Sequence, residues 1–121
     1  MSENLCLDSN VLIDLLGGDK NIASLTQGCL IHISVATRIE LLSWPKLRPD
    51  QIPGTRALLT NFKVHPLDDA VELQAIEFRR AFKMKLGDSI IAATAFEHEL
   101  PLLTSDKHFA RLKNVVEVRM L

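Results

Sequence analysis

The stretch that decides the fold is GDSIIAATAFEHELPLLTSD, residues 87–106. Its first part predicts a helix over residues 88–99, because apolar residues recur three and four positions apart on the face that Asp88 shares. Those apolar positions are Ile91, Ala92, Ala95 and Phe96. Its last part predicts a short strand over residues 101–104, with Asp106 just beyond it. One acid therefore opens a core-facing helix, and a second acid follows a strand.

The rest of the chain alternates between short β-like runs and longer helical runs. Strands are expected at residues 5–7, 30–35, 62–65 and 115–118. Helices are expected at about residues 10–16, 19–28, 36–44, 54–61, 66–84 and 106–113, with Asp69 and Glu72 at capping-box spacing in the fifth. This alternation predicts a single α/β domain, residues 1–121, in three α/β/α layers around a mostly parallel sheet.

Two further acids stand at similar positions. Asp8 ends the apolar run LCLD, and Glu40 interrupts the apolar helix VATRIELLSW. Ligands of open α/β sheets bind outside the carboxyl ends of the strands, where Asp8 and Asp106 are expected. Clustered carboxylates repel one another, and a divalent cation or a shared proton relieves the repulsion. The four acids therefore form a metal-site hypothesis, in which Ser9 and Thr104 could hydrogen-bond the carboxylates.

Each acid also has a simpler interpretation. Asp8, Asp88 and Asp106 could each cap a helix or sit in its first turn, although Ser9 and Asn10 could replace Asp8 as a cap. Glu40 could be an ordinary solvated charge on a helix surface. The case for a site rests on all four acids meeting at one edge.

Composition limits the other possibilities. The chain has 121 residues, 47% of them apolar, and a net charge of −1, so a compact core is expected and strong global attraction to nucleic acid is not. Cys6 and Cys29 are expected to be buried thiols in a reducing compartment, and the scattered histidines do not predict a zinc site. We expect no signal peptide and no membrane span, hence a cytoplasmic protein.

Any phosphate binding must then come from local cations around the acids. Two groups qualify, and both could instead be solvated helix faces. The first group is Arg79, Arg80, Lys83 and Lys85, and the second is Lys107, Arg111 and Lys113.

The chain resembles PIN domains, and specifically the VapC-type toxins of type II toxin–antitoxin pairs. The matching motifs are LDSNVLIDLL (7–16), SVATRIELL (34–42), KLGDSIIAATAFEHELPLLTSD (85–106) and the trailing HFARL. The match spans essentially the whole chain, and only the middle, about residues 44–70, is not diagnostic.

The resemblance implies an endoribonuclease that uses Mg²⁺ or Mn²⁺. Asp8, Glu40, Asp88 and Asp106 match the family's acidic quartet, and Ser9, Asn10 and Thr104 match its supporting polar positions. Asp8 and Asp106 are expected closest to the metal, Asp88 direct or through water, and Glu40 at a second ion or at the attacking water. A homodimer neutralised by a small antitoxin that covers the acidic cleft is also implied. The alternatives are a non-catalytic binding module on this scaffold, a DNA-directed nuclease and a phosphoacceptor receiver domain.

Overall fold

The structure, a computed structural model, describes residues 2–121. The strands are β1 (Asn4–Leu7), β2 (Leu30–Ser34), β3 (Lys63–His65), β4 (Leu102–Thr104) and β5 (Val118–Met120). The α-helices are α1 (Ser9–Leu16), α2 (Lys20–Thr26), α3 (Val35–Leu42), α4 (Ile52–Leu59), α5 (Asp69–Phe82) and α6 (Leu86–Glu97). Two 3₁₀ helices, η1 (Pro49–Gln51) and η2 (Lys107–Leu112), complete the described chain. Among these helices, none is both long and apolar enough to cross a bilayer.

The strands form one sheet in the order β3-β2-β1-β4-β5, and every strand pairing within residues 2–121 is parallel. Leu5 pairs with Ile31 on one side of β1, and Leu7 pairs with Leu103 on the other. The chain first winds outward from β1 to β2 and β3, and then returns to place β4 on the opposite side. The strand order therefore reverses between β1 and β4, and such a switch point opens a crevice at the carboxyl ends of the strands.

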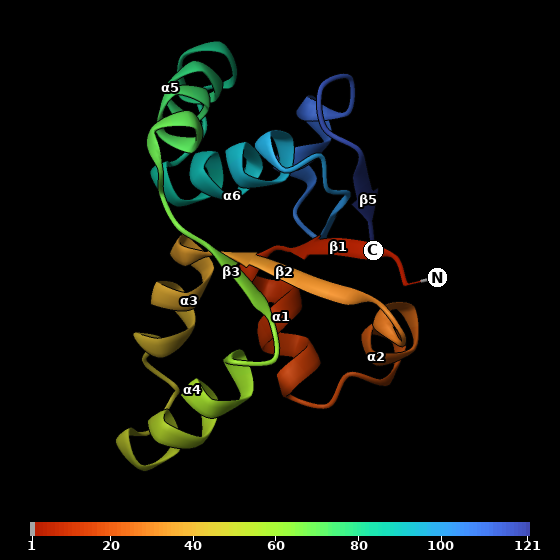
Figure 1. Cartoon of the computed structure of the whole chain (residues 1–121), viewed down its shortest axis with the longest axis vertical. Helices are drawn as coiled ribbons and strands as arrows, with labels where there is room; N and C mark the ends of the chain where they lie inside the picture. Colours follow the sequence, from red (N-terminus) through yellow and green to blue (C-terminus); the bar gives the residue numbers. More distant parts are fainter. Residues whose placement is uncertain (1) are drawn as a thin grey trace.

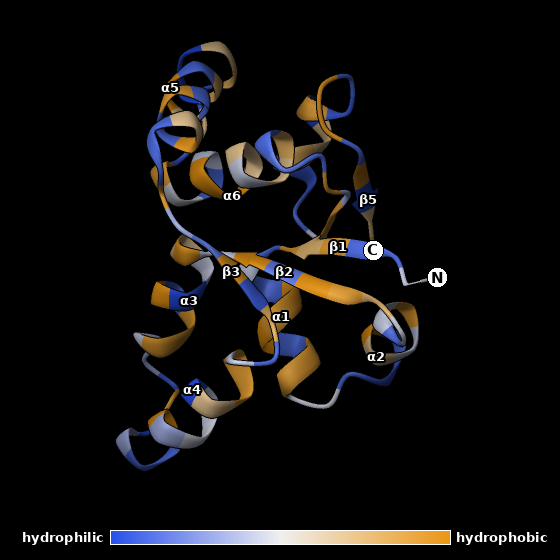
Figure 2. Cartoon of the chain, in the orientation of Figure 1, coloured by the Kyte–Doolittle hydropathy of each residue, from blue (hydrophilic) through white to orange (hydrophobic). Residues whose placement is uncertain are grey.

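Helices cover both faces of the sheet, as expected for three layers (Figure 1). On one face α5, α6 and η2 bury a core that includes Cys6, Phe78, Ile91 and Phe109. On the other face the helices α1 to α4 pack over a second core that includes Leu5, Leu7, Val11, Ile33 and Leu41. Neighbouring residues of β1 face opposite cores, because side chains alternate along a strand. Figure 2 shows the hydrophobic run along β2 between these layers.

Several predicted boundaries were wrong. Helix α6 begins at Leu86, so Asp88 is its third residue and not its cap. Helix α5 is capped by Asp68, whose side chain accepts from the Val71 N–H, and not by Asp69. The helix expected at residues 106–113 is a 3₁₀ helix that spans Lys107–Leu112.

The last strand also lies further along the chain than expected. It begins at Val118, because the N–H groups of Val115 and Val116 both donate to Leu112 O and close a turn. Helix α4 begins two residues earlier than expected, with Pro53 in its first turn, where a missing N–H costs little.

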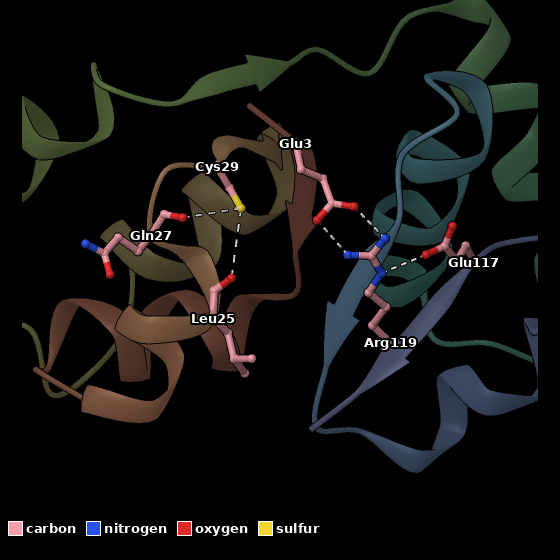
Figure 3. A network of polar contacts seen from close by, with 6 residues as sticks. All are labelled: Glu3, Leu25, Gln27, Cys29, Glu117 and Arg119. Atoms are coloured by element: carbon pink, nitrogen blue, oxygen red, sulfur yellow. Dashed lines mark hydrogen bonds and ion pairs between the residues drawn. The ribbon is translucent and has the colours of Figure 1, made fainter. Parts of the chain in front are cut away.

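The two ends of the chain are tied together by Arg119 (Figure 3). Its guanidinium makes two hydrogen bonds to Glu3, at 2.8 and 2.6 Å, and a third to Glu117 at 2.7 Å. Both cysteines are free thiols in the described chain. Burial raises the pKa of the Cys6 thiol to about 12, whereas Cys29 is only partly buried, contrary to expectation. The Cys29 sulfur lies 3.9 Å from the carbonyl oxygens of Leu25 and Gln27.

Candidate metal and active site

Asp8 lies at the switch point, between the end of β1 and the start of α1. It is buried, and both of its carboxylate oxygens are held: Oδ1 accepts from the Ser9 N–H at 2.7 Å and Oδ2 from the Thr104 hydroxyl at 2.8 Å. Burial raises the pKa of Asp8; the two hydrogen bonds oppose this, and the charges of Asp88 and Asp106 add to it. Asp8 is thus the N-cap of α1 and, at the same time, a buried member of an acidic group.

Thr104 connects the two strand ends. Its hydroxyl donates to Asp8 and accepts from the Asp106 N–H at 3.0 Å, so one buried side chain ties together acids 98 positions apart in sequence. Asp106 caps η2, and its Oδ1 accepts from both the backbone N–H and the ring Nδ1 of His108, at 2.9 and 2.8 Å. These His108 hydrogen bonds hold the pKa of Asp106 below its usual value.

Asp88 reaches the same crevice from the first turn of α6. It is partly buried, and burial raises its pKa, with further contributions from the negative charges of Asp106 and Glu40. Lys85 and His108 act in the opposite direction. The buried apolar face predicted for this helix is present at Ile91, Ala92 and Ala95, whereas Phe96 is more than one-third exposed.

Glu40 comes from α3, which packs against α6. Its side chain lies at the surface, where Oε1 accepts from the Ser9 hydroxyl at 3.2 Å. The same hydroxyl lies 3.1 Å from that of Thr37, which is fully buried. Gly87 of α6 lies close to the Glu40 carboxylate: a Cβ added at Gly87 would be 3.2 Å from Glu40 Oε1. Glu40 therefore joins the other acids through Ser9 and Gly87.

The cations divide among three locations. Lys83, Lys85 and Arg111 line a cavity of about 150 Å³ together with Met84, Asp88, Asp106 and His108. Arg79 and Arg80 line a separate depression with Ile76, and Arg79 Nε donates to Met84 O. Lys107 and Lys113 are exposed outside the cavity, as is Asn10 on α1. A larger cavity, about 640 Å³, lies between α1, α3 and α4, and none of the four acids lines it.

All four acids present oxygen atoms, the donors that Mg²⁺ and Mn²⁺ prefer. In residues 2–121 no three Asp, Glu, His or Cys side chains stand close enough together to form a ready-made ion cage. Mg²⁺ commonly uses only one or two direct carboxylates and keeps several waters. Because the carboxyl pKa values of Asp8 and Asp88 are raised partly by neighbouring acids, added positive charge would relieve that repulsion. The donor set therefore fits a hard divalent cation.

Three neighbours of the acids did not emerge from the sequence as functional residues: Thr37, Gly87 and His108. His108 left one signal, since a residue two positions after an Asp is well placed to hydrogen-bond its carboxylate. For Thr37 the signal is its position three residues before Glu40, on the same side of a predicted helix. Gly87 gives no signal in the sequence, because its role depends on how α3 and α6 pack.

Comparison with known proteins identifies the fold. The family model described as "PIN domain" matches residues 5–115. The chain belongs to the PIN domain family. The predicted family and the three-layer fold with its parallel sheet are thereby confirmed.

Several solved structures are similar to this PIN domain. A toxin–antitoxin complex from Klebsiella pneumoniae contains a chain with 29% identity and a TM-score of 0.84, with 96% of each chain covered. DNA-bound VapBC from Salmonella typhimurium gives 18% identity and a TM-score of 0.80, covering 99% of this chain and 98% of the other. FitAcB from Neisseria gonorrhoeae gives 22% identity and a TM-score of 0.77, covering 94% of this chain and 95% of the other. The last two likenesses support the fold alone. No curated protein matches the chain.

Proposed function

We propose that this PIN domain is a metal-dependent endoribonuclease and the toxin of a type II toxin–antitoxin pair. The observation that carries the proposal is the meeting of Asp8, Asp88 and Asp106 at the switch point between β1 and β4, where burial raises the pKa of Asp8 and the charges of the other two acids add to the rise. Groups with perturbed pKa values in a crevice are candidates for function. The toxin–antitoxin proteins among the structural neighbours favour a toxin role.

The four acids would divide the work according to how firmly each is held. Asp8, fixed by Ser9 and Thr104, would hold the ion together with Asp106. Asp88 would join them directly or through water. Bound Mg²⁺ or Mn²⁺ would supply positive charge against the negative charge that develops on the phosphoryl oxygens. Glu40 is less buried and would hold a second ion or orient the attacking water.

The cavity beside the acids suggests how an RNA phosphate would be held. Lys85 and Arg111 line it next to Asp88 and Asp106, so positive charge borders the negative site. Lys83 ends α5 in a left-handed conformation (φ 54°), which turns the chain toward Lys85 and adds a third cation. Such local cations bind the RNA backbone without reading its sequence. Arg79 and Arg80, which lie outside this cavity, would attract the RNA backbone at longer range.

We further propose a cytoplasmic homodimer whose acidic crevice is covered by a small antitoxin protein. Support comes from the whole-length likeness to a chain of a toxin–antitoxin complex, at 29% identity. An adjacent short gene that encodes a DNA-binding protein would support this role.

A cleavage assay with paired variants tests the activity. Purified protein is incubated with total RNA and with single-stranded DNA, with Mg²⁺, with Mn²⁺ or with a chelator, and new 5′ ends are mapped. Asp8→Asn should abolish cleavage, whereas Asp14→Asn on the exposed face of α1 should retain it. Cleavage of DNA but not RNA would indicate a DNA-directed nuclease. No cleavage by wild type under any of these conditions would indicate a binding module.

A further inference from the structure

Glu40 is exposed on α3, so its own helix does not hold the carboxylate in one place. Two other elements approach it. From α1, the Ser9 hydroxyl donates to Oε1 at 3.2 Å. From α6, the backbone of Gly87 comes so near that a Cβ there would lie 3.2 Å from Oε1 and 3.9 Å from the carboxyl carbon. The carboxylate therefore lies between a hydroxyl and a bare stretch of backbone.

The Ser9 hydroxyl is itself held by a hydrogen bond with the buried side chain of Thr37. Ser9 is 6% exposed and Thr37 is fully buried, and their hydroxyl oxygens are 3.1 Å apart. Thr37 lies three residues before Glu40, so both residues project from the same side of α3. Because the Ser9 hydroxyl has one proton and donates it to Glu40, the Thr37 hydroxyl donates to Ser9 Oγ and holds it in place next to the carboxylate.

Gly87 has no evident backbone reason to be glycine. It lies within α6, where glycine is less favourable than alanine, and its φ is not positive. Gly54 in α4 gives a direct comparison, because a Cβ there would meet nothing within 4 Å. At Gly87, by contrast, a Cβ would crowd the Glu40 carboxylate.

We propose that Gly87 and Thr37 are positioning residues for Glu40: Gly87 leaves the space that the carboxylate occupies, and Thr37 holds the Ser9 hydroxyl that the carboxylate accepts from. Neither residue needs to touch substrate. This inference rests on the proposed nuclease function for its kinetic consequence, and on the apoprotein alone for its structural consequence.

The kinetic test compares two matched glycine variants. Gly87→Ala should lower kcat at least about tenfold, leave KM within about twofold and leave the melting temperature no lower, because a small displacement of a catalytic group is costly while alanine suits a helix. Gly54→Ala should change neither kinetic constant. In a Glu40→Gln background, Gly87→Ala should have no further effect. Additive losses would overturn the proposal, since they would mean that Gly87 acts independently of Glu40.

Thr37 is tested by removing and restoring its hydroxyl. Thr37→Val should lower kcat, and Thr37→Ser should recover most of it, because serine keeps the oxygen and gives up only a methyl group. Equal kcat in the valine variant and wild type would remove Thr37 from the proposal. The Gly87 comparison does not depend on the valine variant folding.

A second measurement follows Glu40 without any reaction. The chemical shift of its carboxyl carbon, measured by NMR in metal-free protein, should move in Gly87→Ala and in Thr37→Val and stay in place in Gly54→Ala. An unmoved signal in Gly87→Ala would overturn the positioning role. Failure of wild type to cleave RNA would instead overturn the proposed function, and the NMR comparison would still decide the positioning role.

Discussion

Three histidines that are far apart in sequence stack beside the sheet and should make the fold sensitive to mild acid. His65, at the end of β3, is buried, and its Nε2 lies 2.8 Å from Nδ1 of His32 on β2. On its other side the ring stacks on that of His98, with centroids 3.9 Å apart. His32 Nε2 is in turn 2.7 Å from Asn4 Oδ1. A second proton on the short contact between the two ring nitrogens would place two N–H groups face to face.

Burial lowers the pKa of His65 from 6.5 to about 4, helped by the charges of His98, His32 and Lys63 and opposed by Asp68. Burial also lowers the pKa of His32, with His98 and Lys63 contributing. The unfolded chain therefore takes up protons at a higher pH than the folded chain. Stability linked to His65 is complete above pH 6.5 and is lost as pH falls toward 4.

The size of the effect follows from the two pKa values of His65. At about 1.4 kcal/mol per pKa unit, full protonation of His65 should lower the free energy of unfolding by about 3.4 kcal/mol, and by about 2 kcal/mol near pH 5. Because water reaches the cluster through exposed His98, we expect roughly 1–2 kcal/mol near pH 5. Asp8 and Asp88 act in the opposite direction. Their pKa values are raised in the folded protein, so their protonation at lower pH stabilises the fold. A difference between variants is therefore more informative than wild type alone.

The assay is urea unfolding near pH 7 and near pH 5, followed by the fluorescence of the single tryptophan, Trp44. His65→Gln keeps a hydrogen-bonding side chain but cannot be protonated, so it should lose less stability between the two conditions than wild type by roughly 1–2 kcal/mol. Gly54→Ala, outside the stack and without a titratable group, should lose as much as wild type. Equal acid losses in His65→Gln and wild type would refute the reasoning.

Three further predictions concern the acidic crevice and its border. Asp88→Asn should raise the melting temperature by roughly 2 °C or more while abolishing RNA cleavage, because it removes a partly buried charge that neighbouring acids repel; a lowered melting temperature by calorimetry would contradict this. Thr104→Val should cost roughly 1–3 kcal/mol in urea unfolding, because Asp8 loses a buried donor, and an unchanged midpoint would refute the role of Thr104. Lys85→Glu and Arg111→Glu should each weaken RNA binding and reduce the slope of log affinity against log salt by about 1, as measured by fluorescence anisotropy; an unchanged slope would remove that residue from the RNA-binding surface.

Much of the fold could be predicted because its causes are local. Apolar runs of strand length alternate with helical periodicity, and this alternation specifies parallel strands joined by helices. The rule that ligands bind at the carboxyl ends of the strands then predicts that Asp8 and Asp106 lie together. The start of α6 was predicted two residues late because Lys85 caps it without a side-chain hydrogen bond, so no capping residue marks the position.

The details of the site depend on packing between distant elements. The approach of Gly87 to Glu40 is set by how α3 packs against α6, and neither helix alone carries a trace of it. The stacking of His65 with His32 and His98 is a similar case, since the three rings come from β2, from β3 and from the end of α6. Sequence spacing describes contacts within one element, whereas these contacts join elements.

A helix cap is the simpler interpretation of Asp8 and of Asp106, and the structure makes it compatible with a place in the crevice. At a switch point, strands end and helices begin on the same edge, so the residues best placed to line the crevice are also N-caps. Asp8 and Asp106 both cap the helix that follows them. Both hydrogen bonds from His108 fall on a single oxygen of Asp106, Oδ1, and the described residues make no hydrogen bond to its other oxygen. Capping thus fixes the direction of a carboxylate without using up its capacity to bind a cation.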